Sequence, residues 1–502
     1  MSTLTALARI EAARTGSAQP VATVRHCHLG EQPLVLIPLK LSGEAAAPLA
    51  AMVGTARKDP ALLVVAQPRN RDLRFGFAAE LAALVLSYVE SRQAGTETVP
   101  TKDGEGRQRY SDAPQVLVPN PGGITFLRLL GRSTRFRRID GPYPVEASVP
   151  LLGRWLTWLC DRAEQPGSSV LMPMTSMLGG HWATGQSTFE DANLGALLGW
   201  LDPPEGMTGP QAALRAEDPL VCPPAGPTTD PGFDNEELAP LLAAYDRAPA
   251  DQARMAATER LRRALRRQLE PTWELMWRSI ELLRALPEGA HVTGRWEGDR
   301  ESFTHFAEGI PEGFPQAKRD SAVAAARRLI RLERAQDELD VQRALDDPLV
   351  MAEHRLTGEA FAGIVVAAQP DRLDTTGKTP KLRPYLQVRT SDPLRVADGD
   401  TVHNAGRKGQ KAQVVDVNAG TVLLELSSGM GRKRVAEPGS VPEVGDRVCF
   451  TTFAADFHRS PVLPPLEQTP WTHGGPPEAY VPGDDEAVAY PPTAADALEV
   501  WE

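Results

Sequence analysis

Cysteine is scarce in this sequence, and its few thiols are widely separated. Only four cysteines occur among 502 residues, and no two of them form a Cys-x-x-Cys pair. They are Cys27, Cys160, Cys222 and Cys449. This spacing argues against a disulfide framework and against a cysteine zinc site. A reducing compartment fits such a sequence best, so we expect the protein in the cytoplasm.

Long apolar runs are also missing. No run reaches the roughly 18 residues that are needed to span a bilayer. The most apolar stretch, FAAELAALVLSYV, is interrupted by Glu80. The N-terminus, MSTLTALARIEAARTG, has no apolar core of the kind found in secretory signals. We therefore expect no membrane association.

Positive charge is not in excess overall. The chain carries 54 Lys and Arg against 65 Asp and Glu, a formal net charge of −11. This balance argues against a uniformly basic nucleic-acid coat, so the local distribution of charge is more informative than the total. A hydrophobic content of 42% and a charged content of 24% are typical of a globular protein. A chain of this length should form roughly two to four domains.

The pattern of elements changes along the chain and predicts an α+β multidomain protein. Short runs rich in Val and Leu alternate with helical patterns over residues 1–217, which predicts an N-terminal α/β domain with a partly parallel sheet. A Pro- and Gly-rich linker at 218–233 precedes a central helical, stalk-like domain at 234–356. Short strands at 357–458 predict a small antiparallel β-barrel, and residues 459–502 form an acidic, Pro-rich, extended tail.

Three local patterns add detail to this division. The segment at 97–112, ETVPTKDGEGRQRYSD, is predicted to be a solvated loop. GRWEGDRESF at 294–303 is predicted to be a mobile connection between two packed antiparallel helices. In STFED, Ser187 is predicted to cap a helix, with Glu190 completing a capping box.

Basic residues gather within the predicted barrel. Between Lys378 and Arg434 there are eleven Lys or Arg and five Asp or Glu, a net charge of +6. Two predicted turns carry most of them: Arg407, Lys408 and Lys411 in the first, and Arg432, Lys433 and Arg434 in the second. Basic loops on a small barrel commonly bind a phosphate backbone without reading bases, so we predict contact with DNA or RNA. The alternative is a structural barrel whose lysines protect its edges.

The barrel also carries a family resemblance. The helical segments and the strands that follow them resemble the stalk and small barrel of superfamily-1 helicases. The resemblance of the barrel rests on PDRLDTTGKTPKLRPYLQVRT, VADGDTVHN, GQKAQVVDVNAGTVLLEL and VGDRVCF. The relevant group comprises the 5′-to-3′ helicases of nonsense decay and replication. The resemblance covers residues 250–455 and implies a stalk and barrel that clamp nucleic acid beside a motor.

The motor of such a helicase is missing from this sequence. Its phosphate-binding loop has the form GxxxxGK[ST], followed by a helix. The nearest match, RLDTTGKT, places Arg372 at the first glycine, and Pro380 follows at once. The resemblance therefore implies that an ATPase would be a separate polypeptide.

A second resemblance concerns RHCHLG at residues 25–30. On a strand, His26 and His28 would project from one face. This pair resembles the histidines of rolling-circle replication nucleases and relaxases, and the resemblance implies a divalent metal with Tyr88 or Tyr110 as the nucleophile. No third ligand is evident, so two structural histidines remain the other interpretation.

Three further segments are candidates for binding. The arginines of RLRRALRRQ, Arg263 and Arg267 among them, either contact phosphate or form a solvated helix face. The amides of PNPGG at 119–123 precede a helical pattern and could receive a phosphate. In the tail, Trp471 and Trp501 are predicted to anchor a partner protein.

These patterns predict a non-catalytic, nucleic-acid-binding accessory subunit of a bacterial cytoplasm. It would contact DNA or RNA mainly through the backbone and would work with a separately encoded helicase, ATPase or nuclease. Genome maintenance and antiphage defence are the expected settings, and no cofactor or metal is expected. One alternative is a metal-dependent nuclease built on His26 and His28. The other is an assembly scaffold without a nucleic-acid role.

Overall fold

The computed structural model of the chain describes residues 3–101, 104–316, 321–377, 379–431, 433–454 and 461–464. The chain divides into two compact units. We call the one that contains Val24–Ala335 the α/β unit and the one that contains Gln336–Pro461 the barrel unit. Trp471 and Trp501, and with them the predicted tail anchors, lie outside the described residues.

A mixed sheet of five strands is the centre of the α/β unit. Its order is β4-β3-β2-β7-β8. The strands are β2 (Leu34–Lys40), β3 (Pro48–Gly54), β4 (Ala61–Val64), β7 (Val116–Val118) and β8 (Leu171–Pro173). The first three form an antiparallel meander, while β7 lies parallel to β2 and β8 parallel to β7. Nearly every residue of β2 and β7 is buried, as in strands that are covered on both faces. The expected α/β architecture is confirmed.

One face of the sheet is covered by long helices. They are α2 (Arg71–Arg92), α3 (Pro121–Thr134), α4 (Ser148–Ala163) and α11 (Val292–Gly309). Leu34 and Leu36 of β2 belong to the same buried cluster as Trp155 of α4 and Phe303 of α11. Helices α3 and α4 can approach closely because α4 carries Gly153, where a Cβ would lie only 2.3 Å from the backbone nitrogen of Arg135.

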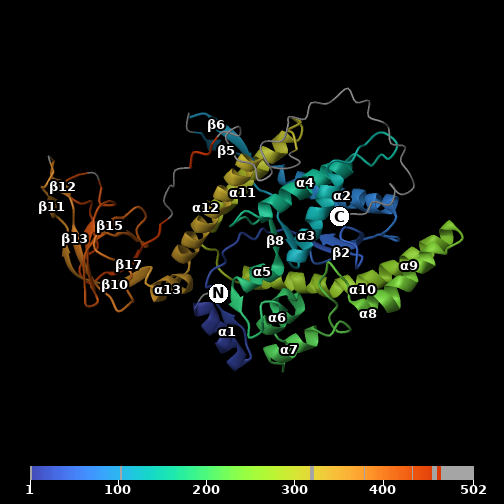
Figure 1. Ribbon diagram of the computed structural model, residues 1–502, viewed down its shortest axis with the longest axis horizontal. Helices are drawn as coiled ribbons and strands as arrows, with labels where there is room; N and C mark the ends of the chain where they lie inside the picture. Colours follow the sequence, from blue (N-terminus) through green and yellow to red (C-terminus); the bar gives the residue numbers. More distant parts are fainter. Residues whose placement is uncertain are drawn as a thin grey trace. The chain divides into compact units, whose positions relative to one another are not determined.

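The opposite face is covered by α10 (Asp251–Arg284), together with α5 (Met174–Gly179), α6 (Leu194–Leu201) and α9 (Ala239–Asp246) (Figure 1). Val35 and Ile37 of β2 pack in one buried cluster with Leu265 and Trp273 of α10. These contacts form an apolar stripe along α10, and the helix continues through Pro271.

That stripe packs on the sheet, which changes the role of the helical segment. The second face of the sheet is as apolar as the first and needs a cover, which α10 supplies. As a result, the α/β unit continues through the Pro- and Gly-rich segment 218–233 and past residue 310. Within the predicted helical segment 234–356, α10 and α11 thus pack on the sheet of the α/β unit.

Two segments that were expected to lack regular structure are folded. The predicted loop instead contributes to a hairpin, in which β5 (Thr96–Pro100) pairs with β6 (Gly106–Tyr110). GRWEGDRESF lies inside helix α11, so the prediction of a mobile connection was wrong. The next helix, α12 (Ala322–Asp346), is not buried along its whole length, since Leu329 is 57% exposed.

The remaining elements are short or peripheral. They are α1 (Thr3–Thr15), β1 (Gln19–Pro20), β9 (Trp182–Ala183), η1 (Glu190–Ala192), α7 (Gly209–Ala216), α8 (Pro231–Phe233), η2 (Asp234–Leu238) and α13 (Pro348–Thr357). Strand β1 pairs only with β9. Among the described residues, we find no helix with the length and apolar character needed to cross a membrane.

The barrel unit contains a closed barrel of antiparallel strands in the order β10-β13-β16-β15-β14-β17. The strands are β10 (Ala360–Gln369), β13 (Tyr385–Arg389), β14 (Thr401–Asn404), β15 (Lys411–Asn418), β16 (Thr421–Leu426) and β17 (Arg447–Thr451). Phe361, Val388, Leu424 and Phe450 fill its interior. A small hairpin, β11 (Leu373–Asp374) with β12 (Lys381–Leu382), connects β10 to β13. The barrel predicted from the sequence is confirmed.

Candidate nucleic-acid interface

The directions of the barrel strands decide where the two basic turns lie. Every neighbouring pair of strands in the barrel is antiparallel. The chain therefore passes from β10 to β13, from β14 to β15 and from β16 to β17 at one end of the barrel. It passes from β13 to β14 and from β15 to β16 at the other end. Both basic turns belong to the first end.

Hydrogen bonds join the two basic turns directly. Nε2 of Gln410 donates to the carbonyl oxygen of Ser440 over 2.7 Å, and the guanidinium of Arg407 donates to the carbonyl of Gly439. The backbone nitrogen of Lys411 donates to Oγ of Ser428 over 3.1 Å. The turns are thus parts of one surface, which we call the basic end.

Charge is divided unequally between the ends of the barrel. Among the described residues 359–454, the basic end carries nine Lys or Arg and six Asp or Glu, whereas the other end carries two and five. The cations of the basic end are Arg372, Lys381, Arg383, Arg407, Lys408, Lys411, Lys433, Arg434 and Arg447. The acids of the opposite end are Glu359, Asp392, Asp398, Asp400 and Asp416. The barrel is therefore electrostatically polar along its axis.

The cations of the predicted interface differ in their surroundings. Lys408, Lys433 and Arg434 are exposed, and no ion pair holds any of them in the described part of the barrel unit. Arg407 and Lys411 are half-buried. Arg432 lies outside the described residues. Three predicted cations are therefore available to an external anion.

The aromatic surface beside the basic end is occupied from within. The guanidinium of Arg372 lies 3.6 Å from the ring centroid of Tyr385, and its Nη1 is 2.7 Å from a carboxylate oxygen of Glu425. One face of this ring is therefore covered. The same contacts fix Arg372 at the start of RLDTTGKT, whose Leu373 and Asp374 form strand β11 of the β11–β12 hairpin.

The arginine cluster of α10 is largely compensated. Arg267 pairs with Glu237, and Nη1 of Arg266 is 3.5 Å from a carboxylate oxygen of Glu270. Arg263 is exposed, and its Nε lies 3.5 Å from the carbonyl of Glu259. This arrangement is typical of a solvated helix face.

The chain itself covers the amides of PNPGG. Asn120 caps α3 and donates from Nδ2 to the carbonyl of Gly226 over 2.7 Å. A Cβ on Gly122 would lie 2.8 Å from Cδ of Pro227. The backbone nitrogen of Lys40, the last residue of β2, donates to the carbonyl of Pro227 over 2.7 Å. Residues 226–227 thus lie at the ends of β2 and β7, where the strand order of the sheet reverses. Open α/β sheets usually bind ligands at such a point, but here the chain itself fills it.

The RHCHLG segment is not part of a strand, which corrects the expected geometry of its histidines. The ring of His26 stacks on His181 with centroids 5.9 Å apart, and the ring of His28 stacks on Trp296 at 4.2 Å. The backbone nitrogen of His28 donates to Oγ of Ser169 over 3.0 Å. Both rings therefore take part in packing between distant segments.

The two candidate nucleophiles have structural partners as well. The hydroxyl of Tyr88 accepts a hydrogen bond from the backbone nitrogen of Gln115 over 3.2 Å and lies 3.1 Å from the carbonyl of Gln32. Burial raises the pKa of this phenol, so the phenolate is disfavoured. Tyr110 packs against Phe303, with ring centroids 5.3 Å apart. Within the described ranges, no three His, Cys, Asp or Glu residues are grouped so that they could hold a metal ion.

Comparisons of the chain with protein-family models, with curated proteins and with solved structures find no match. The similarity of the barrel to the helicase barrel therefore stays a prediction.

The histidine segment leads to a prediction about pH. Burial lowers the pKa of His28, although Glu288, 3.8 Å from its Nδ1, opposes this shift. As the pH falls, His28 therefore binds a proton at about pH 6.5 in the unfolded chain and only at a lower pH in the folded chain. Stability should therefore fall as the pH is lowered through about 6.5. Replacing His28→Gln should reduce this acid-side slope when unfolding free energy is measured between pH 5 and 8, and an unchanged slope would contradict the prediction.

Proposed function

We propose that this chain is a nucleic-acid-binding accessory subunit whose barrel contacts the phosphate backbone of DNA or RNA through its basic end. The observation that supports the proposal most is the meeting of two basic loops on one surface. Three of its cations, Lys408, Lys433 and Arg434, are exposed and make no ion pair within the described barrel unit. Such cations can neutralise phosphates and release their counterions without first breaking an internal contact.

The same surface favours binding without sequence recognition. Proteins that contact the bases of a single strand usually stack them on aromatic rings that have a free face. Here Arg372 covers one face of Tyr385 at the basic end. The acidic opposite end of the barrel should repel the backbone, so the polarity of the barrel would orient it on a strand. Binding should be weak and strongly dependent on salt.

The accessory role follows from the chemistry that the described residues do not provide. RLDTTGKT lacks the first glycine of a phosphate-binding loop and is followed by a strand instead of a helix. We therefore infer that a separately encoded helicase, ATPase or nuclease supplies the catalysis. The expected setting is genome maintenance or antiphage defence in the cytoplasm.

Binding of the full chain to a fluorescently labelled single strand of uniform sequence, such as oligo(dT), tests the interface. We expect Lys433→Gln/Arg434→Gln to reduce the slope of log affinity against log salt by about 1.4 units, because each lost phosphate contact removes about 0.7 for single strands. Fluorescence anisotropy at four salt concentrations measures the slope.

The matched control removes the same charge from the opposite end of the barrel. Arg389→Gln/Arg395→Gln changes two exposed cations that lie near the acidic loops. This variant should retain the wild-type slope. Equal effects of the two double variants would show that overall charge, and not the basic end, determines binding, and would overturn the proposal.

A further inference from the structure

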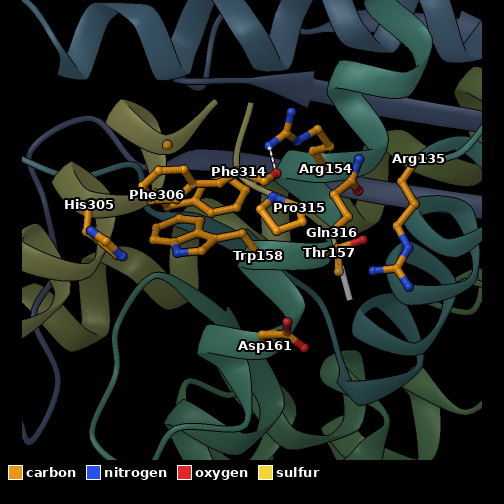
Figure 2. A pocket seen from close by; sticks show the side chains of 11 residues that line it. Arg135, Arg154, Thr157, Trp158, Asp161, His305, Phe306, Phe314, Pro315 and Gln316 are labelled. Carbon is orange, nitrogen blue, oxygen red and sulfur yellow. Dashed lines mark hydrogen bonds between the residues drawn. The ribbon is translucent and has the colours of Figure 1, made fainter. Parts of the chain in front are cut away.

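A cavity of about 290 Å³ lies in the α/β unit beside α4, α11 and the chain that follows α11 (Figure 2). Helix α4 contributes Arg154, Thr157, Trp158 and Asp161. These positions are three and four residues apart, so they share one face of the helix. A single helix face thus supplies an aromatic ring, two charges and a hydroxyl to one cavity.

One wall of this cavity is aromatic. Trp158 stacks on Phe306 of α11, with ring centroids 5.5 Å apart and an interplanar angle of 16°. Phe314 lies beside them and is 44% exposed (Figure 2). Its approach depends on Gly309, where a Cβ would lie 2.5 Å from Cδ2 of Phe314. The wall offers apolar ring surface to a planar molecule.

Two arginines also line the cavity. Arg135 follows the last residue of α3, and Arg154 donates from Nη2 to the carbonyl of Phe314 over 3.3 Å. The Nε atoms of both arginines are buried and have no hydrogen-bond partner. In the described part of the chain, neither arginine forms an ion pair, although Arg135 lies 4.6 Å from the ring centroid of Phe136.

The acid in the cavity is already engaged elsewhere. Asp161 lies 3.4 Å from Nη2 of Arg328, which also pairs with Glu164. A second cation, Arg128, lies 2.8 Å from Glu164. Asp161 therefore faces Arg328 first and Arg135 only at longer range, and it forms no ion pair with Arg154 in the described part of the chain.

We infer that this cavity binds a small planar ring that carries a phosphate, as in a mononucleotide. The ring would lie against Trp158 and Phe314, and the phosphate would accept hydrogen bonds from Arg135 and Arg154. A phosphate dianion balances two guanidinium charges, and the fork of arginine suits phosphate oxygens. A volume of about 290 Å³ holds one such unit. This inference concerns the α/β unit and does not depend on the function proposed for the barrel.

Calorimetry on the full chain can separate the two halves of the ligand. We expect the strongest of AMP, GMP, CMP and UMP to bind at least about tenfold more tightly than its nucleoside or than ribose 5-phosphate, since each of these lacks one contact. A 5′-phosphorylated dinucleotide identifies the source. If the dinucleotide binds as tightly as the mononucleotide, the cavity accepts the 5′ end of a strand. If the dinucleotide does not bind, the ligand is a free nucleotide.

Two variants assign the contacts. Arg135→Gln/Arg154→Gln should weaken nucleotide binding at least about tenfold and leave nucleoside binding unchanged. Phe314→Ala, at a partly exposed position, should weaken nucleotide and nucleoside but leave ribose 5-phosphate unchanged. Arg132→Gln, on the exposed side of α3, is the matched charge control and should bind like the wild type.

The outcomes are decisive in each case. No measurable binding of any mononucleotide, or full binding by the Arg135→Gln/Arg154→Gln variant, would overturn the inference. If that variant does not fold, as circular dichroism would reveal, Phe314→Ala decides alone, and nucleotide binding that it does not weaken would overturn the inference. The Lys433→Gln/Arg434→Gln variant should retain nucleotide binding, so this test and the test of the barrel can fail separately.

Discussion

Replacing Asp299→Ala is expected to lower the free energy of unfolding of the α/β unit by about 3–5 kcal/mol, because it removes one member of a buried ion pair. Asp299 is fully buried in α11. Its carboxylate accepts hydrogen bonds from Nη2 of Arg162 at 2.5 Å, from Oγ of Ser168 at 2.7 Å and from the backbone nitrogen of Ser169 at 2.8 Å. Alanine would leave the guanidinium and the amide without their acceptor.

Urea unfolding followed by tryptophan fluorescence measures this effect. Seven of the nine tryptophans lie within Val24–Ala335, so the signal reports mainly on the α/β unit. Glu301→Ala is the matched control, since it removes a carboxylate from the same helix that pairs with Arg107 at the surface. Such exposed pairs contribute about 0–1 kcal/mol. Equal losses in the two variants would show that Asp299 is not a buried anchor.

The part of the fold that the sequence predicted depends on contacts between near neighbours. The apolar strands of the barrel, the turns between them and the stripe of α10 all follow from local periodicity. The reciprocal hydrogen bonds of the predicted capping box are another example: the backbone nitrogen of Ser187 donates to Glu190 over 2.6 Å, and the nitrogen of Glu190 lies 3.3 Å from Oγ of Ser187. The expected helix does not begin at Ser187, because only a single 3-10 turn at Glu190–Ala192 follows, with Phe189 at its N-cap position. Both partners stand three residues apart, so a short window of sequence contains the whole motif.

The incorrect predictions concern residues whose partners are distant in sequence. GRWEGDRESF is polar, and a local reading therefore places it in solvent. In the structure its Asp299 meets the amide of Ser169, which is 130 positions away, and its Trp296 stacks on His28. The burial of these residues depends on tertiary contacts that no local pattern contains. The same applies to His26, which stacks on His181.

The candidate sites show the same division. The two basic turns were recognisable from composition, but only the strand directions place both at one end of the barrel. The cavity beside α4 was not predicted, although a signal existed. Arg154, Thr157, Trp158 and Asp161 follow a helical period and place charges beside a large ring. The other wall comes from residues 305–316, and its position could not be derived from the sequence.

The last prediction tests whether α10 belongs to the core of the α/β unit. Trp273 is 2% exposed and packs against the sheet. The contact is close, because a Cβ added to Gly54 of β3 would lie only 3.2 Å from Cη2 of the Trp273 ring. Its Nε1 donates to the carbonyl of Arg57 over 2.9 Å. Trp273→Ala should therefore cost about 3–5 kcal/mol, because it removes the ring and leaves a cavity beneath the strands.

The form of the transition distinguishes a core helix from an independent stalk. If α10 covers the sheet, Trp273→Ala should shift the unfolding of the whole α/β unit, and circular dichroism and tryptophan fluorescence should give the same midpoint. Met255→Ala, at a position of the same helix that is 73% exposed, should change stability by less than about 0.5 kcal/mol. In a stalk, the variant would lose helical signal at low urea while the fluorescence midpoint remained near that of the wild type. Separate midpoints would therefore show that the sheet is stable without α10, which its buried contacts with β2 argue against.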